Sequence, residues 1–295
     1  MNRILITGSN GQLGNEIRCL TEDDSTNKYF YTDVEELDIT DIKAVGVFVE
    51  ENQINVIINC AAYTQVDKAE DDIDTAYLIN ATASQNLAEV SAKFNATLFH
   101  ISTDYVFDGS NSTPYRESET TSPLGVYGKS KLQSEKLIQE SGCSYIIIRT
   151  SWLYSSFGNN FVKTIGKLTR EKDELKVVFD QVGTPTYARD LATAILSIID
   201  KNNLNNRNEV YHFSNEGVCS WYDFAIAINN YFGHNCKINP CHSDEFPTKV
   251  TRPHFSVLDK TKIKNDFKLN IPYWEDSLKK CIEILKERET VKFKL

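Results

Sequence analysis

The feature that most constrains this chain is a glycine-rich turn, TGSNGQLG, between an apolar segment at 3–7 and a predicted helix at 12–20. Gly8, Gly11 and Gly14 stand where a chain that turns tightly, and packs its helix closely on its strand, needs residues without a Cβ. The free N–H groups at the start of such a helix can bind a diphosphate. A GxxGxxG triplet also suits a turn selected only for its geometry. Residues later in the chain therefore decide whether this triplet indicates a dinucleotide-binding site.

Strand-like and helix-like segments alternate through the first half of the chain, which is typical of repeated βαβ units. Further apolar strands are predicted at 29–32, 56–60, 98–101 and 145–149, with helices at 12–20, 42–51, 75–93 and 126–139. Strands this apolar fit a parallel sheet that is covered on both faces. The predicted fold class is therefore α/β, with a Rossmann-like doubly wound parallel sheet.

The pattern changes after residue 150, where helices and short strands mix and a polar stretch, NNLNNRN at 202–208, predicts a loop. We expect a dinucleotide-binding domain at 1–155, and we expect residues 176–201 to pack on this domain as well. The remainder of 156–295 is expected to form a smaller, mixed C-terminal lobe that closes over the edge of the sheet and binds the substrate.

The composition narrows the range of partners. The 295 residues include 32 Lys and Arg against 41 Asp and Glu, a net charge of −9, so no overall positive field attracts nucleic acid. No apolar run approaches the ~18 residues of a membrane-spanning helix, and no signal-peptide pattern precedes the first strand. Seven scattered cysteines do not suggest a disulfide framework. We therefore expect a cytoplasmic protein that binds neither nucleic acid nor a membrane.

Acidic side chains follow the second predicted strand. Asp33 ends that strand, where a carboxylate can accept hydrogen bonds from an adenosine ribose. A carboxylate there repels a 2′-phosphate, which favours NAD over NADP unless the side chain turns away. Asp38 and Ile39 can line the adenine, although Asp38 equally suits a helix N-cap or a turn. With the glycine turn before it, Asp33 favours a dinucleotide site.

Tyr127 and Lys131 stand four residues apart in YGKSK and so share one face of a predicted helix. An ammonium beside a phenol lowers the phenol pKa toward the working range, so that the tyrosine can exchange a proton with a carbonyl or an alcohol. Ser102 and Thr103 follow a predicted strand at the edge where ligands bind in open α/β sheets. A hydroxyl there can hold the same substrate oxygen. These residues predict a proton-transfer site.

Several motifs together carry a resemblance to a known family: TGSNGQLG, NCAAYTQVDKAE, STDYVFDG, VYGKSK, IRTSWLY, GTPTYARDLA and RPHFSVLD. Over essentially its whole length the chain resembles the extended short-chain dehydrogenase/reductases and, within them, the dTDP-4-dehydrorhamnose reductase family. The resemblance implies that Tyr127 is the catalytic acid, that Lys131 is its partner and a ribose ligand, and that Thr103 helps to position the sugar C4 oxygen. It implies NADPH or NADH as cofactor and a dTDP-sugar as substrate.

The glycine turn and the resemblance also indicate which residues surround each ligand. The expected cofactor-binding residues are Gly8, Gly11, Gln12, Leu13, Gly14, Asp33, Asp38, Ile39, Ala61, Ala62, Tyr63, Tyr127 and Lys131. The expected substrate-binding residues are Thr103, Asp104, Trp152 and Arg252. From the residues alone, Trp152 can stack on a sugar or pack the lobe boundary, and Arg252 can pair with a diphosphate or form a surface salt bridge.

The triplet Thr103-Asp104-Tyr105 helps to choose between related activities. Dehydratases that resemble this family carry Thr-Asp-Glu, whose two carboxyl groups assist elimination of water, and Tyr105 is a poor base for that step. The triplet favours a reductase over a dehydratase, and the resemblance implies that the reaction is reduction of the C4 keto group of dTDP-4-dehydro-L-rhamnose to give dTDP-L-rhamnose. Two alternatives stay open: another nucleotide-sugar 4-epimerase or reductase, and a non-catalytic, cofactor-binding regulatory subunit.

One departure from the family concerns a metal ion. Some members bind Mg²⁺ through glutamates at a subunit contact of a homodimer. Glu16 matches one such position, but Arg189 occupies another, where a guanidinium repels a hard cation. We therefore predict no metal at this contact, and a homodimer of this chain would not be bridged by one.

A second candidate metal site lies in the sequence HNCKINPCH, which holds His234, Cys236, Cys241 and His242. Structural zinc sites usually take paired ligands from two separated turns, and this cluster does not follow that spacing. A loop with two small buried cysteines is favoured over a zinc site.

Overall fold

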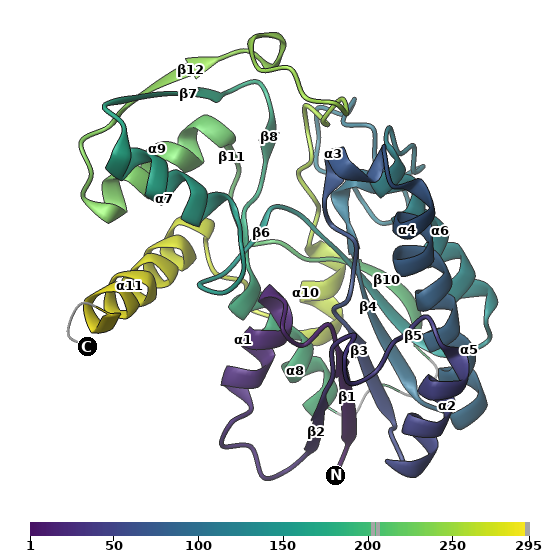
Figure 1. Cartoon of the computed structure of the whole chain (residues 1–295). Helices are drawn as coiled ribbons and strands as arrows, with labels where there is room; N and C mark the ends of the chain where they lie inside the picture. The colour runs from purple at the N-terminus through teal and green to yellow at the C-terminus, as the bar shows by residue number, and fades with distance from the viewer. Residues whose placement is uncertain (202–203, 205–206, 293–295) are drawn as a thin grey trace.

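A parallel sheet of six strands forms the centre of the molecule (Figure 1). The computed structural model describes residues 1–201, 204 and 207–292. The strands are β1 (Arg3–Thr7), β2 (Lys28–Tyr31), β3 (Val56–Asn59), β4 (Thr97–Thr103), β5 (Ser144–Thr150) and β10 (Asn208–His212). Their order across the sheet is β10-β5-β4-β3-β1-β2, and all neighbours are parallel. The chain winds outward in both directions from β1 and β3, which leaves a crevice beyond the carboxyl ends of these strands.

Helices cover both faces of the sheet, as such apolar strands require. The helices on one face are α1 (Gln12–Leu20), α8 (Ala188–Asp200) and α10 (Thr261–Phe267). Those on the other are α2 (Ile42–Glu51), α5 (Ala83–Phe94) and α6 (Val126–Glu140). Alternate residues of β1 serve the two cores: Ile4 and Ile6 pack on the first face and Leu5 on the second. The predicted doubly wound α/β fold class is confirmed.

The helix predicted over 75–93 is interrupted. It consists of α4 (Ile73–Tyr77), a π-helical turn (Leu78–Thr82) and α5. The wider turn directs the buried Asn80 inward, where its oxygen accepts from the Tyr63 N–H at 2.8 Å and its nitrogen donates to Ser130 Oγ at 3.0 Å. Because these contacts come from distant parts of the chain, the spacing of apolar residues did not reveal the turn.

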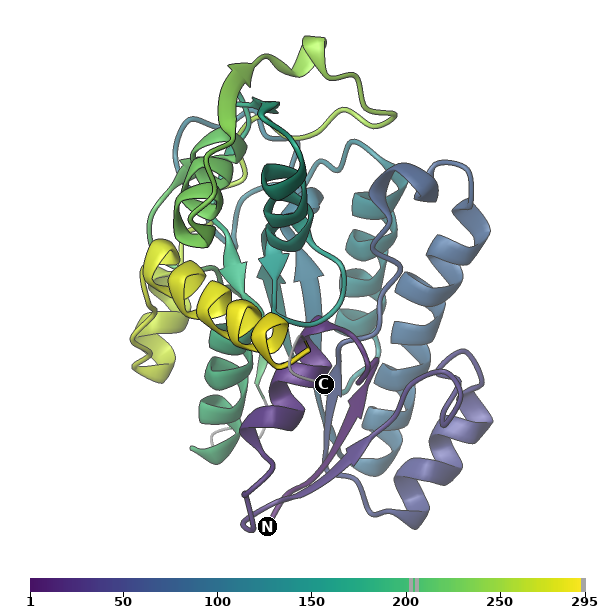
Figure 2. The ribbon, with the colours of Figure 1, turned by 60° about the vertical axis from the view of Figure 1, so that its left-hand side comes forward.

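A smaller lobe sits over the carboxyl ends of the strands (Figures 1 and 2). Its elements are the short strands β6 (Leu153–Tyr154), β8 (Val182–Gly183), β9 (Thr186–Tyr187) and β11 (Cys219–Ser220), the strand pair β7 (Glu174–Val178) and β12 (Lys237–Cys241), and the helices α7 (Phe161–Glu171), α9 (Trp221–Phe232) and α11 (Trp274–Lys292). A separate apolar core, built on residues such as Phe224, Ile228 and Leu278, holds it together.

The division between sheet and lobe differs from the sequence expectation. Of 176–201, only α8 packs on the sheet, because Leu191, Ile195 and their neighbours join its core, whereas β7 pairs with β12 in the smaller lobe. Residues 208–212, expected in the lobe, instead form β10 beside β5. Residues 202, 203, 205 and 206 of the expected polar loop lie outside the described residues.

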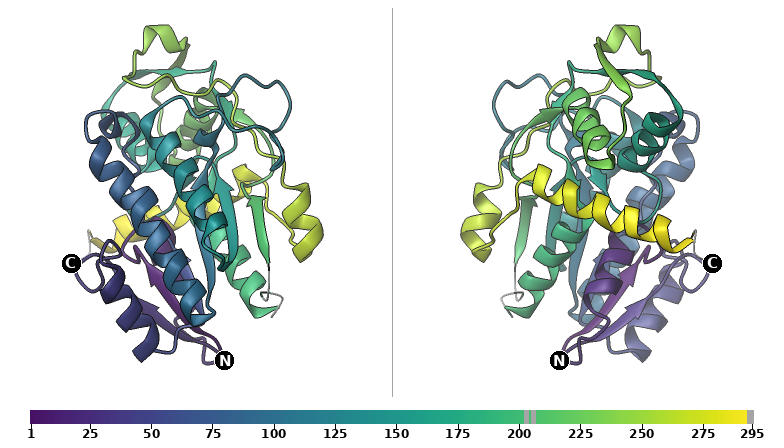
Figure 3. Two further views of the ribbon diagram at one scale, coloured as in Figure 1. Left: turned by 90° about the vertical axis from the view of Figure 1, so that its right-hand side faces the viewer. Right: turned by 90° about the vertical axis from the view of Figure 1, so that its left-hand side faces the viewer.

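The two side views in Figure 3 show α11 running across one side of the molecule, below the other elements of the smaller lobe. At 19 residues it is the length of many membrane-spanning helices, but charged side chains recur along it. Within the ranges that the structure covers, no helix combines the length and apolar character needed to cross a membrane.

Candidate active site

A large cavity opens at the carboxyl ends of β4 and β5, between the sheet and the smaller lobe. Its volume is about 520 Å³, and a second cavity of about 490 Å³ lies beyond the ends of β1, β2 and β3. Gly11, Cys60 and Ala62 line both. The larger and the second cavity therefore form one groove that runs from the point where the strand order reverses to the smaller lobe.

The glycine turn gives the groove its backbone wall. Gly8 has φ +61°, and a Cβ there would lie 2.6 Å from the Ala61 nitrogen; a Cβ on Gly14 would lie 2.5 Å from the Ser9 Cα. Gly11 is the N-cap of α1 and has no side chain to cap the first N–H groups. The start of α1 therefore offers backbone donors to an anion at a place where no side chain intrudes, which fits the diphosphate of a dinucleotide.

Asp33 lies at the mouth of the second cavity, where its Oδ2 accepts from the Asn10 N–H at 3.0 Å and its Oδ1 from the Val34 N–H at 2.9 Å. Asp38 accepts from the N–H and hydroxyl of Thr40, so it shapes a turn, and it also lines the cavity. The N-cap of α2 is Asp41 instead. Both roles considered for Asp38, turn residue and cavity wall, therefore coexist.

The loop after β6 meets the start of α1. Asn160 Nδ2 donates to Gln12 Oε1 at 2.9 Å and to the Ser155 carbonyl at 2.7 Å. Gly158 and Asn160 line the larger cavity with Gln12 and Leu13. The smaller lobe therefore contributes to the wall around the expected diphosphate position, a contact that joins residues 148 positions apart and was not foreseen.

Tyr127 lies at the start of α6 and enters the larger cavity beside Thr103. Its ring packs edge-on against Tyr105, with ring centroids 5.5 Å apart. Burial raises the pKa of Tyr127, and a hydrogen bond with Thr103 lowers it in part. Ser102 points elsewhere, because its hydroxyl donates to Glu135 at 2.5 Å. Although both residues line the larger cavity, it is thus the hydroxyl of Thr103 that interacts with the phenol.

Lys131 does not produce the expected effect on Tyr127. Its Nζ lies 3.0 Å from His100 Nε2, and burial lowers the pKa of Lys131 to about 7. Lys131 therefore does not lower the pKa of the phenol in this arrangement, although the two residues share a helix face and both line the larger cavity. The spacing predicted the shared face but not the competing partner on β4.

Asp104 is 2% exposed and lines the larger cavity. Its Oδ1 accepts from Thr103 Oγ1 at 3.0 Å, and its Oδ2 has no partner among the described residues. Burial raises the pKa of Asp104 to about 7. The Oδ2 atom itself is almost inaccessible, and the Ser256 side chain also lowers the pKa of Asp104 in part, so this oxygen is enclosed by the protein.

Two tryptophans form the lobe side of the larger cavity. Trp152 and Trp221 stack with ring centroids 3.6 Å apart, and Phe161 packs against Trp221 at 4.5 Å. Trp152 has φ +49°, an uncommon conformation for a bulky residue that often marks a functional site. The sequence singled out Trp152, but Trp221 was assigned to the core; its position as the first residue of α9 was the available signal.

Arg252 lies beside the cavity rather than in its wall. Its guanidinium donates to Asp67 at 2.6 Å and to the Tyr105 hydroxyl at 3.3 Å. Ala62 lines both cavities, and Ala61 and Ile39 line the second cavity. Tyr63 donates hydrogen bonds from its N–H to Asn80 and from its hydroxyl to Asp72. Most expected site residues thus meet at one groove, and Arg252 is bound in a salt bridge at its edge.

Comparison with known proteins identifies the family of this chain. Residues 1–287 match the family described as RmlD substrate binding domain. A dTDP-4-dehydrorhamnose reductase from Aggregatibacter actinomycetemcomitans is 41% identical over 287 residues, which cover 95% of this chain and 98% of that protein. This chain belongs to the dTDP-4-dehydrorhamnose reductase family.

Solved structures of this reductase family have the same fold. The enzyme from Clostridium acetobutylicum is 44% identical, with a TM-score of 0.91 and coverage of 96% of this chain and 99% of that one. The enzyme from Bacillus anthracis, solved in complex with NADP, is 39% identical, with a TM-score of 0.90 and the same coverage.

The reductase-family metal position is occupied by an ion pair. Glu16 is buried; its Oε1 accepts from Ser155 Oγ at 2.5 Å, and its Oε2 lies 3.7 Å from Arg189 Nη1. A guanidinium in this place does not fit a cation site. The described residues also contain no group of three or more His, Cys, Asp or Glu that could hold a metal.

The residues considered for zinc are dispersed. Cys236 precedes β12 and Cys241 is its last residue, and both are buried, as expected for small apolar side chains. His234 stacks on Phe232, and His242 faces Asp180 at 3.7 Å.

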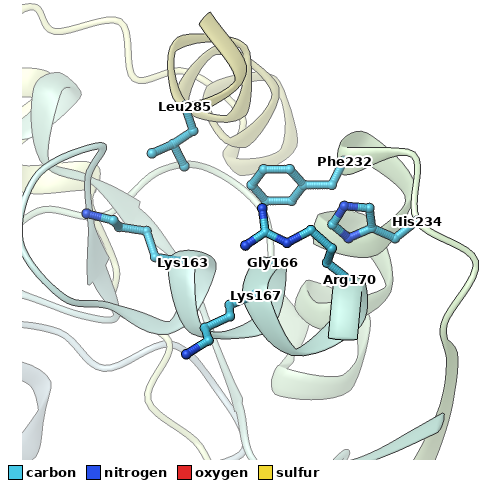
Figure 4. A pocket seen from close by; sticks show the side chains of 7 residues that line it. All are labelled: Lys163, Gly166, Lys167, Arg170, Phe232, His234 and Leu285. Atoms are coloured by element: carbon cyan, nitrogen blue, oxygen red, sulfur yellow. The ribbon is translucent and has the colours of Figure 1, made fainter. Parts of the chain in front are cut away.

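A basic pocket of about 150 Å³ lies away from this groove, between α7, the end of α9 and α11 (Figure 4). Lys163 and Lys167 line it but point in different directions, and Lys163 Nζ donates to the Gly158 carbonyl at 2.7 Å. Its basic groups do not converge on one point, so the reductase groove remains the candidate site.

Proposed function

We propose that this chain reduces the C4 keto group of dTDP-4-dehydro-L-rhamnose to give dTDP-L-rhamnose, with NADPH or NADH as the reductant. The observation that carries the proposal is the meeting of Tyr127 and Thr103 with a backbone-lined dinucleotide groove in a member of this reductase family. The nicotinamide, when bound, supplies the hydride.

The proton is assigned to Tyr127. Its high pKa keeps the phenol protonated at neutral pH, so it can donate to the sugar oxygen as negative charge develops there. Thr103 can hydrogen-bond the same oxygen once its hydroxyl turns away from Asp104, to which it now donates. Asp104 lies in the cavity wall beside Thr103, and the stacked Trp152 and Trp221 offer an apolar surface to the sugar ring.

Tyr105 supports reduction over dehydration. Burial raises the pKa of Tyr105 to about 12, and its hydroxyl accepts from Arg252. A phenol that stays protonated at neutral pH is a poor base, so the triplet Thr103-Asp104-Tyr105 lacks the second carboxylate that elimination of water requires. Simple reduction needs no base at this position.

Both dinucleotides are included in the proposal. Asp33 is half-buried at the mouth of the second cavity and favours a free ribose 2′-hydroxyl, which suits NADH. The Bacillus anthracis relative, however, was solved with NADP. We expect both to support turnover, with NADH favoured to the extent that Asp33 keeps its present orientation.

The test is oxidation of each dinucleotide at 340 nm with dTDP-4-dehydrorhamnose generated in situ by the upstream dehydratase and epimerase. Substrate-dependent loss of absorbance, with formation of dTDP-rhamnose, is the expected result. Binding of the dinucleotide without turnover would instead favour a different keto-sugar, an epimerase, or a cofactor-binding regulatory subunit. UDP-linked 4-keto sugars tested in parallel distinguish the first of these.

We propose that the smaller lobe, built on α7, α9 and α11, determines the choice of sugar, because Trp221 and Phe161 reach the larger cavity from it. We also propose a cytoplasmic location, which the burial of five cysteines as apolar side chains supports. Should the chain form a homodimer, we propose that no metal bridges it, because Arg189 already neutralises Glu16.

A further inference from the structure

A buried hydrogen-bond network lies behind the larger cavity, between β3, β4 and α6. Lys131 Nζ reaches His100 Nε2 at 3.0 Å, and neither side chain is more than 1% exposed. Lys131 also lines the larger cavity, so its amine can turn from His100 toward Tyr127 without a change in the backbone. The question is what holds it on His100.

Asn59 determines which nitrogen of His100 carries the proton. The backbone N–H of Ala61 can only donate, and it donates to Asn59 Oδ1 at 3.1 Å; Thr7 Oγ1 donates to the same oxygen at 2.8 Å. The amide nitrogen of Asn59 therefore faces His100, 3.1 Å from Nδ1. Because an amide nitrogen only donates, Nδ1 must accept, and the neutral ring carries its proton on Nε2.

The Nε2–H of His100 then faces two atoms. Ser134 Oγ lies 3.0 Å from Nε2 and donates its own hydrogen to the Lys131 carbonyl at 2.6 Å, so its lone pair accepts from the ring. Lys131 Nζ, also 3.0 Å from Nε2, meets the same N–H. An ammonium has only hydrogens to offer and would oppose this donor, whereas an amine offers a lone pair. The contact therefore favours an uncharged Lys131.

The carboxylate nearest Lys131 does not reverse this preference. Glu135 follows Lys131 by one turn of α6, and its charge raises the pKa of Lys131 in part. Both of its oxygens are already engaged, by Arg149 of β5 at 2.7 Å and 2.9 Å and by Ser102 at 2.5 Å. Burial is the larger effect, and it lowers the pKa of Lys131.

Of the other titratable groups at this end of the cavity, Tyr127, Cys60 and His100 are neutral near pH 7, and Asp104 is partly ionised. Burial raises the pKa of Tyr127 on α6 and of Cys60 beyond β3, to about 12 for the thiol. It raises that of Asp104 at the end of β4 to about 7. Burial lowers the pKa of His100 well below its ordinary value, so the ring stays neutral.

We propose that His100 is a positioning residue for the reaction: its Nε2–H holds Lys131 as an uncharged amine in a resting position, and binding of a dinucleotide releases the side chain into the larger cavity, where it takes up a proton from solvent. The ribose hydroxyls and the phenol of Tyr127 supply oxygen acceptors there in place of the ring N–H. The proposal rests on the proposed function for the arrival of a dinucleotide. It makes the charge of Lys131 depend on cofactor binding.

The test follows the NMR shift of the Lys131 ε-carbon through a pH titration, with the signal assigned by its loss in Lys131→Arg. Without nucleotide, Lys131 should titrate at least about two pH units below the other lysines. Addition of NADPH should move it toward the ordinary range. A Lys131 that titrates with the other lysines before NADPH is added would overturn the proposal.

The nitrogen shifts of His100 provide a measurement that needs no variant. A proton on Nε2 is expected, with Nδ1 as acceptor; a proton on Nδ1 would overturn the assignment, since Nε2 would then accept from an ammonium. This measurement also decides the matter if substitutions at His100 prevent folding.

His100→Gln is the discriminating variant, because its amide oxygen can accept from an ammonium at the same place. The Lys131 titration should rise by more than about one pH unit in this variant. Ser134→Ala is the matched control: it removes a neighbour of Nε2 but leaves the N–H facing Lys131, so the low titration should persist. An unchanged titration in His100→Gln would show that burial alone lowers the pKa of Lys131, and it would overturn the role of His100.

These outcomes separate the two proposals. The titration without nucleotide and the His100 nitrogen shifts do not depend on turnover. A low-titrating Lys131 in a protein that binds NADPH but does not reduce the sugar would support the role of His100 and contradict the proposed function alone.

Discussion

The two parts of the groove use different chemistry. The second cavity is lined mainly by glycines, apolar side chains and main-chain groups, besides the carboxylates of Asp33 and Asp38. The larger cavity places Asp104, Tyr127 and Lys131 out of water, where their charge depends on burial and on individual hydrogen bonds. Backbone shape therefore governs binding in one part, and proton equilibria govern reactivity in the other. Substitutions that affect one part and spare the other test this division.

The largest effect is expected from Tyr127→Phe. Loss of the proton donor should lower kcat by about 10²- to 10⁴-fold, the usual contribution of general acid catalysis. Dinucleotide affinity, measured by fluorescence titration, should stay close to that of the wild type because the backbone wall is unchanged. Wild-type turnover in this variant would show that another group donates the proton.

Gly8→Ala should impair dinucleotide binding in the second cavity. A Cβ would lie 2.6 Å from the Ala61 nitrogen at a residue with φ +61°, so the turn must shift and dinucleotide affinity should fall roughly tenfold or more. Gly142→Ala is the matched control, since it also has a positive φ, +78°, but nothing lies within 4 Å. If both variants bind NADPH equally well, close approach at Gly8 is unimportant.

Asp104→Asn should change how stability depends on pH. The pKa of Asp104 is raised to about 7 in the folded protein, so the folded state binds more protons than the unfolded state and loses stability as pH rises from about 4 to 7. Above pH 7 the free energy of unfolding of the asparagine variant should therefore exceed that of the wild type, by at most about 4 kcal/mol. Near pH 4 this difference should disappear. Denaturant titrations at several pH values measure the difference.

Asp108→Asn is the control of opposite sign. Hydrogen bonds from Ser110 lower the pKa of Asp108, so its charged form contributes stability that is lost as pH falls. The asparagine variant should be less stable than the wild type at neutral pH, and the two stabilities should approach each other in acid. Parallel pH trends in the two variants would contradict the assignment of Asp104 as a destabilised buried carboxylate.

The smallest effect is expected from metal removal. Because Arg189 lies beside Glu16, EDTA and added Mg²⁺ should leave the rate of dinucleotide oxidation unchanged. Arg189→Glu removes the guanidinium and introduces a second carboxylate, so this variant serves as the case in which a response to Mg²⁺ is expected. A rate that EDTA lowers and Mg²⁺ restores in the wild type would require a metal site elsewhere.

Local sequence was informative wherever a role depends on consecutive residues. The glycine turn, the position of Asp33 just after β2 and the helix that carries Tyr127 could all be predicted, because turn geometry and helix periodicity are short-range properties. The predicted bounds of α1 and α2 match those of the structure.

Residues whose role depends on distant partners could not be predicted. His100 acts on a helix 31 positions away, and Trp221 meets Trp152 only when the smaller lobe packs over the sheet. The π-helical turn at Leu78–Thr82 likewise arises from the inward contacts of Asn80. One signal was available for His100: it alternates with Ser102 on β4, so both lie on the face that α6 covers.

The late position of β10 in the chain has a consequence for biosynthesis. When a ribosome has translated β1 to β5, the edge of β5 is unpaired, and the face carrying Ile146 and Ile148 still lacks α8, β10 and α10. A nascent chain that folds these five strands first would expose the β5 edge and this apolar face until the residues of α10 emerge, and we expect chaperones to bind during this interval.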